Sequence, residues 1–175
     1  AIERGFSKED ALALCNLYSR DNARTPMQWS DETEGGFTTG TPWFPVNPNY
    51  RQINVAKQMD DPTSILSFYR ALLALRKNKI YENVFVYGRF EPAYEEIKDV
   101  FAFYRRAEEG YALIVSNWGK ENITIELSDE DTRLWCMLDN MAEDYKLGTA
   151  LRASMAQKEA QKSITLKPGQ VRVYG

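Results

Sequence analysis

The stretch that decides the fold runs from Ser19 to Trp29 and reads SRDNARTPMQW. Neither helical nor strand periodicity is present in it, or in the residues that follow up to about Asp60. This region is dense in Gly, Pro, Asn and Asp and holds Trp29 and Trp43. A loop of this length is uncommon inside a compact domain and usually serves a function or wraps against another body. Because it is so aromatic, we expect it to pack on something larger.

Regular structure is predicted on both sides of this loop. Ser7 has the character of a helix cap, and apolar residues at helical spacing follow it, so a helix is expected from about Ser7 to Tyr18. A second helix is predicted to begin with Asp61 as its cap and Pro62 in its first turn. Its apolar stripe reaches Leu75 and gives it a wide face to bury.

After Ile80 the pattern changes to period two. Short apolar runs predict six or seven strands, at 84–87, 100–104, 111–118, 123–127, 134–138, 164–166 and 171–174. The sequence 167–169, Lys-Pro-Gly, suits a type II turn. These features predict an all-β antiparallel sandwich. Residues 139–162 fit neither pattern, and a helix over 150–161 and a long polar insertion between edge strands stay open as alternatives.

Composition excludes several classes of function. The formal net charge is -3, from 22 basic and 25 acidic residues, so no basic field favours nucleic acid as a partner. No run reaches the roughly 18 apolar residues of a membrane span, and the first residues lack the apolar core of a signal peptide. We therefore expect no membrane partner and a cytoplasmic location. Histidine is absent, which excludes histidine-dependent nucleophile systems and most zinc sites, and no cofactor or metal is expected.

Two further groups of reactive side chains receive structural interpretations. Cys15 and Cys136 lie far apart in differently patterned segments and are expected to be reduced and buried. Carboxylates cluster at 95–96, 108–109 and 129–131 (Asp129, Glu130 and Asp131). Each cluster lies between predicted strands, so we expect solvated turns rather than acid/base pairs.

The opening stretch resembles the RDNARTPMQW run of glycoside hydrolase family 13, as found in oligo-1,6-glucosidases, dextran glucosidases and trehalose-6-phosphate hydrolases. The similarity continues in order through residues 36–43, 46–55 and 61–77. It implies that residues 1–79 are the end segment of an α/β barrel, with the last loop and helix of a (β/α)8 barrel. Residues 80–175 would then be the C-terminal β-sandwich domain of the same family.

The resemblance implies a retaining, exo-acting α-glucosidase for oligosaccharides, with α-1,6 bonds as the favoured linkage. The two carboxylates of such enzymes lie in this family on barrel strands that precede the matching stretch. A barrel takes about 250 residues, so this chain would hold only its last part and be inactive alone. The substrate would be bound through the missing barrel. The uncovered helix and loop would expose apolar surface or associate with further copies of the chain.

One substrate-binding residue, Arg20, follows from the resemblance. It matches the family position whose guanidinium reaches into the sugar pocket beside the non-reducing glucose. A planar group with five donors can hold a sugar hydroxyl and a carboxylate together. The alternative is that Arg20 only pairs with Asp21 or a neighbouring acid. The residues expected to shape the loop are Asp21, Asn22, Arg24, Gln28 and Trp29, and packing is favoured over sugar stacking for Trp43 and Tyr50.

A different class of function rests on aromatic residues of the predicted strands. They are Phe85, Tyr87, Phe101, Phe103, Tyr111, Trp118 and Trp135. Exposed rings of this kind would suit a non-catalytic sandwich that binds carbohydrate or a partner protein. Aromatic residues in strands more often belong to a core, so this stays the alternative.

Overall fold

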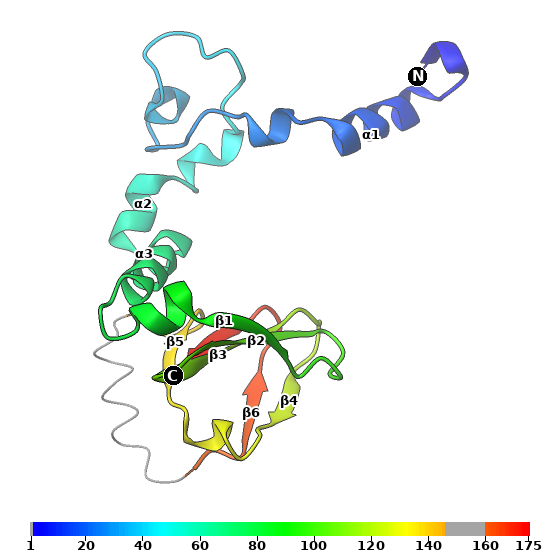
Figure 1. Cartoon of the computed structure of the whole chain (residues 1–175). Helices are drawn as coiled ribbons and strands as arrows, with labels where there is room; N and C mark the ends of the chain where they lie inside the picture. The colour runs from blue at the N-terminus through cyan, green and yellow to red at the C-terminus, as the bar shows by residue number, and fades with distance from the viewer. Residues whose placement is uncertain (1, 146–159) are drawn as a thin grey trace. The chain divides into compact units, whose positions relative to one another are not determined.

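The computed structural model describes residues 2–145 and 160–175 (Figure 1). Contacts divide the chain into two compact units, Ala1–Asp60 and Asp61–Gly175. The alternatives for a helix or an insertion over 150–161 fall almost entirely outside the described residues.

The first unit combines two α-helices with short 3-10 turns. Helix α1, Lys8–Tyr18, begins as predicted, because the Ser7 hydroxyl caps it by accepting from the Asp10 N–H at 3.0 Å. Helix α2, Val55–Asp60, was not predicted. It is too short for a periodic pattern, and it is held by buried Asn54, whose Oδ1 accepts from the Lys57 N–H at 2.9 Å. The 3-10 turns span Ile2–Arg4, Asp21–Ala23, Thr33–Gly36 and Pro48–Arg51.

The second unit opens with helix α3, Ile65–Arg76, which begins three residues later than predicted. Ser64 is the cap, and its hydroxyl accepts from the Ser67 N–H at 3.1 Å. The prediction of Asp61 as the cap was wrong. The Asp61 carboxylate instead accepts from the N–H and the hydroxyl of Thr63, at 2.8 and 2.7 Å, in the turn before the helix. Pro62 lies in that turn.

Two antiparallel sheets follow α3. Strands β1 (Arg89–Ala93), β2 (Val100–Ala107), β3 (Gly110–Asn117), β7 (Val171–Tyr174) and β5 (Cys136–Asp139) form a five-stranded sheet in the order β1-β2-β3-β7-β5. Strands β4 (Ile123–Glu126) and β6 (Ser163–Leu166) pair in a second sheet. The predicted turn before β7 is confirmed, because Gly169 has a φ of +72° and the Gln170 N–H donates to the Lys167 carbonyl at 3.0 Å.

The predicted strand at 84–87 was wrong. Residues Asn83–Tyr87 form a π-helical turn, in which the Phe85 N–H donates to the Tyr81 carbonyl at 2.9 Å. A helical spacing places the rings of Tyr81 and Phe85 edge to face, 6.3 Å apart, and buries Phe85. The strand on the side of β2 away from β3 is β1, which the apolar pattern missed because Glu91 and Pro92 interrupt it.

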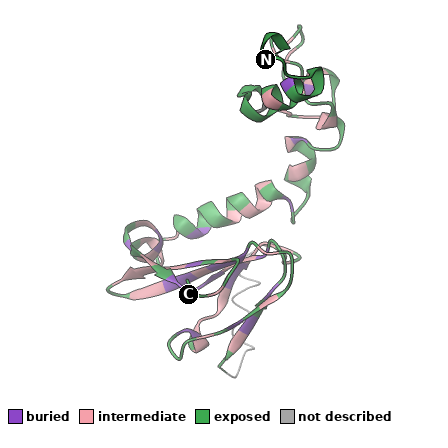
Figure 2. Cartoon of the chain, turned by 90° about the vertical axis from the view of Figure 1, so that its right-hand side faces the viewer, coloured by how far each residue is buried: buried purple, intermediate pink, exposed green. Residues whose placement is uncertain are grey.

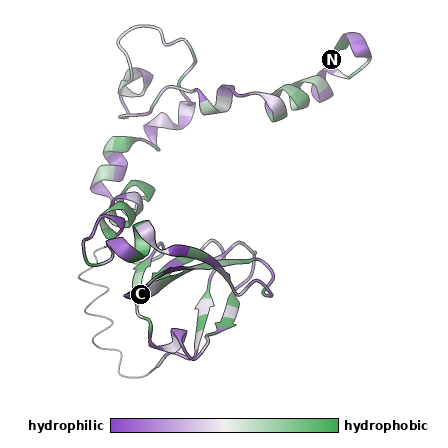
Figure 3. Ribbon diagram, in the orientation of Figure 1, coloured by the Kyte–Doolittle hydropathy of each residue, from purple (hydrophilic) through white to green (hydrophobic). Residues whose placement is uncertain are grey.

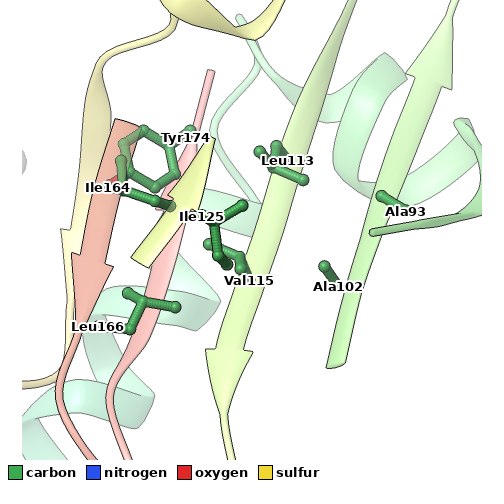
Figure 4. Close-up of a cluster of buried hydrophobic side chains, with 8 residues drawn as sticks. All are labelled: Ala93, Ala102, Leu113, Val115, Ile125, Ile164, Leu166 and Tyr174. Atoms are coloured by element: carbon green, nitrogen blue, oxygen red, sulfur yellow. The ribbon is translucent and has the colours of Figure 1, made fainter. Parts of the chain in front are cut away.

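The core lies on both faces of the five-stranded sheet. Between the two sheets lie eight buried residues, Ala93, Ala102, Leu113, Val115, Ile125, Ile164, Leu166 and Tyr174 (Figure 4). On the opposite face, α3 and the π-helical turn pack Leu75 and Phe85 against Ala112, Met137, Leu138 and Val173. The alternation of Ala112 and Leu113 between the two clusters shows the period of two that the sequence predicted.

Many apolar side chains of the helices are exposed (Figures 2 and 3). On α1 these are Leu12, Leu17 and Tyr18, and on α3 they are Ile65, Tyr69, Leu72 and Leu73. The predicted exposure of apolar surface is therefore present in this structure. The prediction of buried cysteines was wrong for Cys15, because α1 turns that thiol outward; Cys136 is partly buried, and both are free.

Candidate functional site

Arg20 lies at the start of the 3-10 turn Asp21–Ala23, directly after α1. The turn is closed through the backbone, since the Arg20 carbonyl accepts from the Ala23 N–H at 3.2 Å. The Arg20 side chain is exposed, and it forms no hydrogen bond or ion pair with another described residue. Its five donors are therefore available to a ligand in this structure.

Asp21 pairs with Arg24 rather than with Arg20. The Arg24 Nη1 and Asp21 Oδ1 atoms are 4.0 Å apart, and both side chains are more than half exposed. An exposed pair at this distance contributes little to stability. The Asp21 backbone is held from the other side, because its N–H donates to the Ser19 hydroxyl at 3.1 Å. The expected role of Asp21 in shaping the turn thus rests mainly on backbone contacts.

Gln28 connects the stretch to the second half of the loop, as predicted. Its Nε2 donates to the Asn49 Oδ1 at 3.0 Å and to the Ile53 carbonyl at 2.5 Å. The Gln28 carbonyl in turn accepts from the Val55 N–H at 2.9 Å, at the first residue of α2. The amide side chain therefore satisfies one side-chain oxygen and one backbone carbonyl that have no strand or helix to join, and the Gln28 backbone holds the start of α2.

Trp29 is fixed through its backbone. Its N–H donates to the Gly35 carbonyl at 2.8 Å, and its carbonyl accepts from the Ala56 N–H at 3.0 Å. Gly35 is buried with a φ of +63°, and a Cβ there would lie 3.2 Å from the Val46 Cγ1. Only glycine meets both requirements without strain. The predicted loop-shaping role of Trp29 is confirmed for its backbone, while its ring is half exposed.

The two aromatic residues considered for sugar stacking differ in exposure. Trp43 is 87% exposed and contacts Phe44, with ring centroids 4.6 Å apart. Tyr50 is partly buried, and the Arg51 guanidinium lies 5.6 Å from its ring centroid. The sequence favoured a packing role for both residues. The partial burial of Tyr50 agrees with that role better than the exposure of Trp43 does.

The Asp131 carboxylate lies in the second unit, and the prediction that it belongs to a solvated turn was wrong. The residue is fully buried. Its Oδ2 accepts from the hydroxyls of Tyr94, Tyr104 and Ser128, at 2.6, 2.7 and 2.8 Å. The Tyr111 hydroxyl reaches Oδ1 at 3.3 Å. Burial of such a carboxylate is tolerated because several donors replace its water.

The hydroxyls around Asp131 are held in their neutral form. Burial raises the pKa of Tyr94, Tyr104 and Tyr111, and contact with the Asp131 carboxylate raises the pKa of each further. A fully buried carboxylate whose partners are all in place cannot reach a substrate, so this cluster is structural. The signal in the sequence was the tyrosine at position 104, a polar residue on the inward face of β2, which requires a buried partner.

Arg106 covers the cluster from the solvent side. Its guanidinium lies 4.2 and 4.5 Å from the ring centroids of Tyr104 and Tyr111. It also forms two hydrogen bonds with the Glu130 carboxylate, at 2.7 and 3.0 Å, and an ion pair with Glu91 at 2.9 Å. The hydrogen bond with Glu130 raises the pKa of Arg106, although burial opposes this shift. Glu130 and Asp131 are therefore neighbours with different environments.

The part of the chain that the structure describes contains neither a cluster of metal ligands nor a candidate membrane span. No group of three or more Cys, Asp or Glu side chains there is arranged to hold a metal ion. No helix there is long and apolar enough to cross a membrane.

Comparison with known proteins identifies the family. The α-amylase catalytic domain family matches residues 2–88. The oligo-1,6-glucosidase of Parageobacillus thermoglucosidasius is 33% identical over 98% of this chain and 28% of its own length. The trehalose-6-phosphate hydrolase of Bacillus subtilis is 32% identical over the same shares. The chain thus spans less than a third of the length of these curated relatives.

Solved structures give the same result. The trehalulose synthase MutB of Pseudomonas mesoacidophila is 32% identical, with a TM-score of 0.78 over 99% of this chain and 29% of that one. The isomaltulose synthase of Klebsiella sp. is 29% identical, with a TM-score of 0.81 over the same shares. The chain carries the motif around Arg20, and its relatives are named as glucosidases. Because of these similarities, the chain belongs to glycoside hydrolase family 13, the α-amylase family.

Proposed function

We propose that this chain is the C-terminal part of a retaining, exo-acting α-glucosidase that hydrolyses α-glucosidic bonds in oligosaccharides, with α-1,6 bonds preferred. The observation that carries the proposal is the 19–29 stretch, which leaves the Arg20 guanidinium free at the end of α1. Relatives named oligo-1,6-glucosidase support the choice of linkage. A cytoplasmic location belongs to the same proposal.

The proposed domain organisation assigns residues 1–79 to the incomplete end of the catalytic barrel and residues 80–175 to a C-terminal β-sandwich. The catalytic-domain match ends at residue 88, directly before β1 begins at Arg89. All seven strands of the described residues follow that point. The buried cluster shared by the two sheets supports a sandwich. Helix α3 would then be the barrel's last helix, with its Leu75 side packed on the tail domain.

The proposed mechanism assigns no catalytic residue to this chain. A retaining glucosidase uses two carboxyl groups about 5–5.5 Å apart, one as nucleophile and one as acid/base. We propose that polypeptide outside the 175 residues supplies both, so the chain alone is inactive. Arg20 would act as a binding residue. Its planar guanidinium can donate to a sugar hydroxyl and to a carboxylate at once, and so fix the glucose ring relative to the reacting acid.

The test is a substitution in the complete enzyme that contains this segment. Arg20→Ala removes charged hydrogen bonds worth roughly 2–3 kcal/mol, so kcat/KM for isomaltose is expected to fall about 30- to 150-fold. Arg24→Ala is the matched control, because Arg24 is an exposed arginine four residues away whose ion-pair partner is Asp21. It is expected to change kcat/KM less than about threefold. The 175-residue chain serves as the blank.

The result that would overturn the assignment of Arg20 is an equal effect of the two substitutions. Glucose release by the 175-residue chain above the level of buffer would overturn the proposal that the catalytic acids lie elsewhere. The two outcomes are independent, since one concerns binding and the other the location of the acids.

A second candidate function is a non-catalytic module that binds carbohydrate or a partner protein. The exposed aromatic side chains of the strand region favour it: Tyr87, Phe90, Phe101 and Trp118 are each at least half exposed. The prediction that such residues form a core is correct for Phe85 and wrong for Tyr87, Phe101 and Trp118, which are 73%, 53% and 77% exposed.

A further inference from the structure

Two connections of the five-stranded sheet meet beside Trp118. One joins β1 to β2 and the other follows β3, and the pairing of Val100 with Asn117 brings them to the same end of the sheet. Together they line a hollow of about 460 Å³. Its lining side chains are those of Trp118, Ile123 and four charged residues, Lys98, Asp99, Lys120 and Glu121. We call it the Trp118 hollow.

The indole ring of Trp118 is held in place although it is exposed. Its Nε1 donates to the hydroxyl of buried Ser116 at 2.9 Å, and that hydroxyl donates to the Phe101 carbonyl at 2.9 Å. The Trp118 N–H donates to the Asp99 carbonyl at 2.8 Å. Exposing the apolar surface of such a large ring to water costs free energy. Because hydrogen bonds already order the ring, a ligand that packs on its flat face causes little further loss of entropy.

The turn that carries Trp118 is equally fixed. The side chain of Asn117 is almost fully buried and forms three hydrogen bonds. Its Nδ2 donates to the carbonyls of Glu121 and Leu166, at 2.8 and 3.0 Å, and its Oδ1 accepts from the Gly119 N–H at 2.8 Å. The hollow therefore keeps its shape without a ligand, which lowers the cost of binding one.

The charges of the hollow indicate the kind of ligand. The head groups of Lys98, Asp99, Lys120 and Glu121 form no hydrogen bond or ion pair with any described residue. With two cations and two anions around one ring, a ligand with a strong net charge of either sign would be repelled by one of the two pairs. They also oppose an apolar protein surface, because covering them would remove four charges from water without partners. A neutral ligand with many hydroxyls and one apolar face satisfies both conditions.

We propose that the Trp118 hollow binds a neutral gluco-oligosaccharide at a site separate from hydrolysis. The C–H face of a pyranose ring packs on the indole, whose face is the negative side of its quadrupole. Asp99 and Glu121 accept from sugar hydroxyls, while Lys98 and Lys120 donate to them. The choice of glucose units rests on the proposed α-glucosidase function, whereas the site itself rests on the geometry above.

The test uses the 175-residue chain labelled with 15N and titrated with isomaltotriose or maltotriose. An open site of this kind is expected to bind with a Kd of about 1–10 mM, so ligand is added to about 50 mM. The indole N–H signal of Trp118 and the amide signals of Lys120 and Glu121 should shift and saturate. Trp118→Ala should abolish the amide shifts, and Trp118→Phe should weaken them by about three- to tenfold in Kd.

Trp43→Phe is the matched control, because Trp43 is also a largely exposed tryptophan and belongs to the other unit. It should leave the shifts around Trp118 unchanged. Unshifted signals at about 50 mM sugar, or equal shifts in Trp118→Ala with dispersed amide signals that show it is folded, would overturn the proposal. Binding here does not depend on Arg20, so a failed test of the glucosidase leaves this result interpretable. Binding of other sugars in place of glucans would reject only the choice of glucose units.

Discussion

Replacing Asp131 by asparagine should destabilise the second unit strongly. The Asp131 Oδ2 accepts from Tyr94, Tyr104 and Ser128 within 2.8 Å. Hydrogen bonds to a charged group are worth about 1.5–3 kcal/mol each, and a buried donor left without a partner costs about 1–3 kcal/mol. An asparagine amide keeps one neutral acceptor and turns an NH2 group toward some of these donors. We therefore expect a loss of about 2–4 kcal/mol, against a total stability of about 5–15 kcal/mol.

The measurement is urea unfolding of the 175-residue chain, followed by far-UV circular dichroism. The matched control is Asp129→Asn, which makes the same change on an exposed residue two positions earlier. It should alter the free energy of unfolding by less than about 0.5 kcal/mol. With an m-value of about 1–3 kcal/mol per molar urea, a loss of about 2–4 kcal/mol should lower the midpoint of the Asp131 variant by at least roughly 0.7 M.

Equal midpoints for the two variants would refute this reasoning. They would mean that the three hydroxyls find other partners at little cost, and that the buried carboxylate stabilises the sheet no more than a neutral amide does. A changed m-value would instead indicate a different extent of unfolding, and the comparison would then use amide exchange of β2 and β3, where the tyrosines lie.

Two predictions concern titration. Because burial and the Asp131 carboxylate raise the pKa of Tyr104 above its ordinary value of 10.0, the native state holds that proton more tightly than the unfolded state. The contribution of protonated Tyr104 to the free energy of unfolding is therefore fully present below about pH 10 and is lost above it. Between pH 9 and 11, the urea midpoint should fall less steeply with pH in Tyr104→Phe than in the unsubstituted chain. Burial raises the pKa of the Cys136 thiol to about 11. Iodoacetamide at pH 8 should thus modify exposed Cys15 in the native chain and leave Cys136 unmodified until urea is added, as mass spectrometry of peptides would show.

The sequence predicted elements best where the pattern was long. Strands β2 and β3 are eight residues each, and their alternation identified both. The run at 84–87 is only four residues long, and a short apolar run does not distinguish a strand from one helical turn. Tertiary contact decided it, because the π-helical turn buries Phe85 against Leu75 of α3.

Helix starts and buried polar groups were harder to predict for different reasons. Asp61 and Ser64 are both good caps, and only the contacts of Asp61 with Thr63 show that Ser64 has the role. The environment of Asp131 depends on tyrosines that are 20 to 37 residues away in the sequence. No pattern near Asp131 contains that information, and inward-facing Tyr104 indicates only that some buried partner exists. The general role of Gln28 was predicted correctly because a polar residue in an aperiodic loop usually satisfies backbone groups, although its partners Asn49 and Ile53 lie 21 and 25 residues away.

Arg20 differs from Gln28, because its own contacts do not fix its side chain within the described residues. It lies two residues after Tyr18, at the end of a helix whose Leu17 and Tyr18 are exposed. Burying such side chains stabilises a fold by about 1.5–3 kcal/mol each, so a covering surface for α1 is strongly favoured. On the proposal that the remainder of the catalytic barrel is this surface, the docking of α1 sets the position of Arg20. The guanidinium would then be positioned in a sugar pocket by the burial of Leu17 and Tyr18, about one helical turn away, rather than by a hydrogen bond of its own.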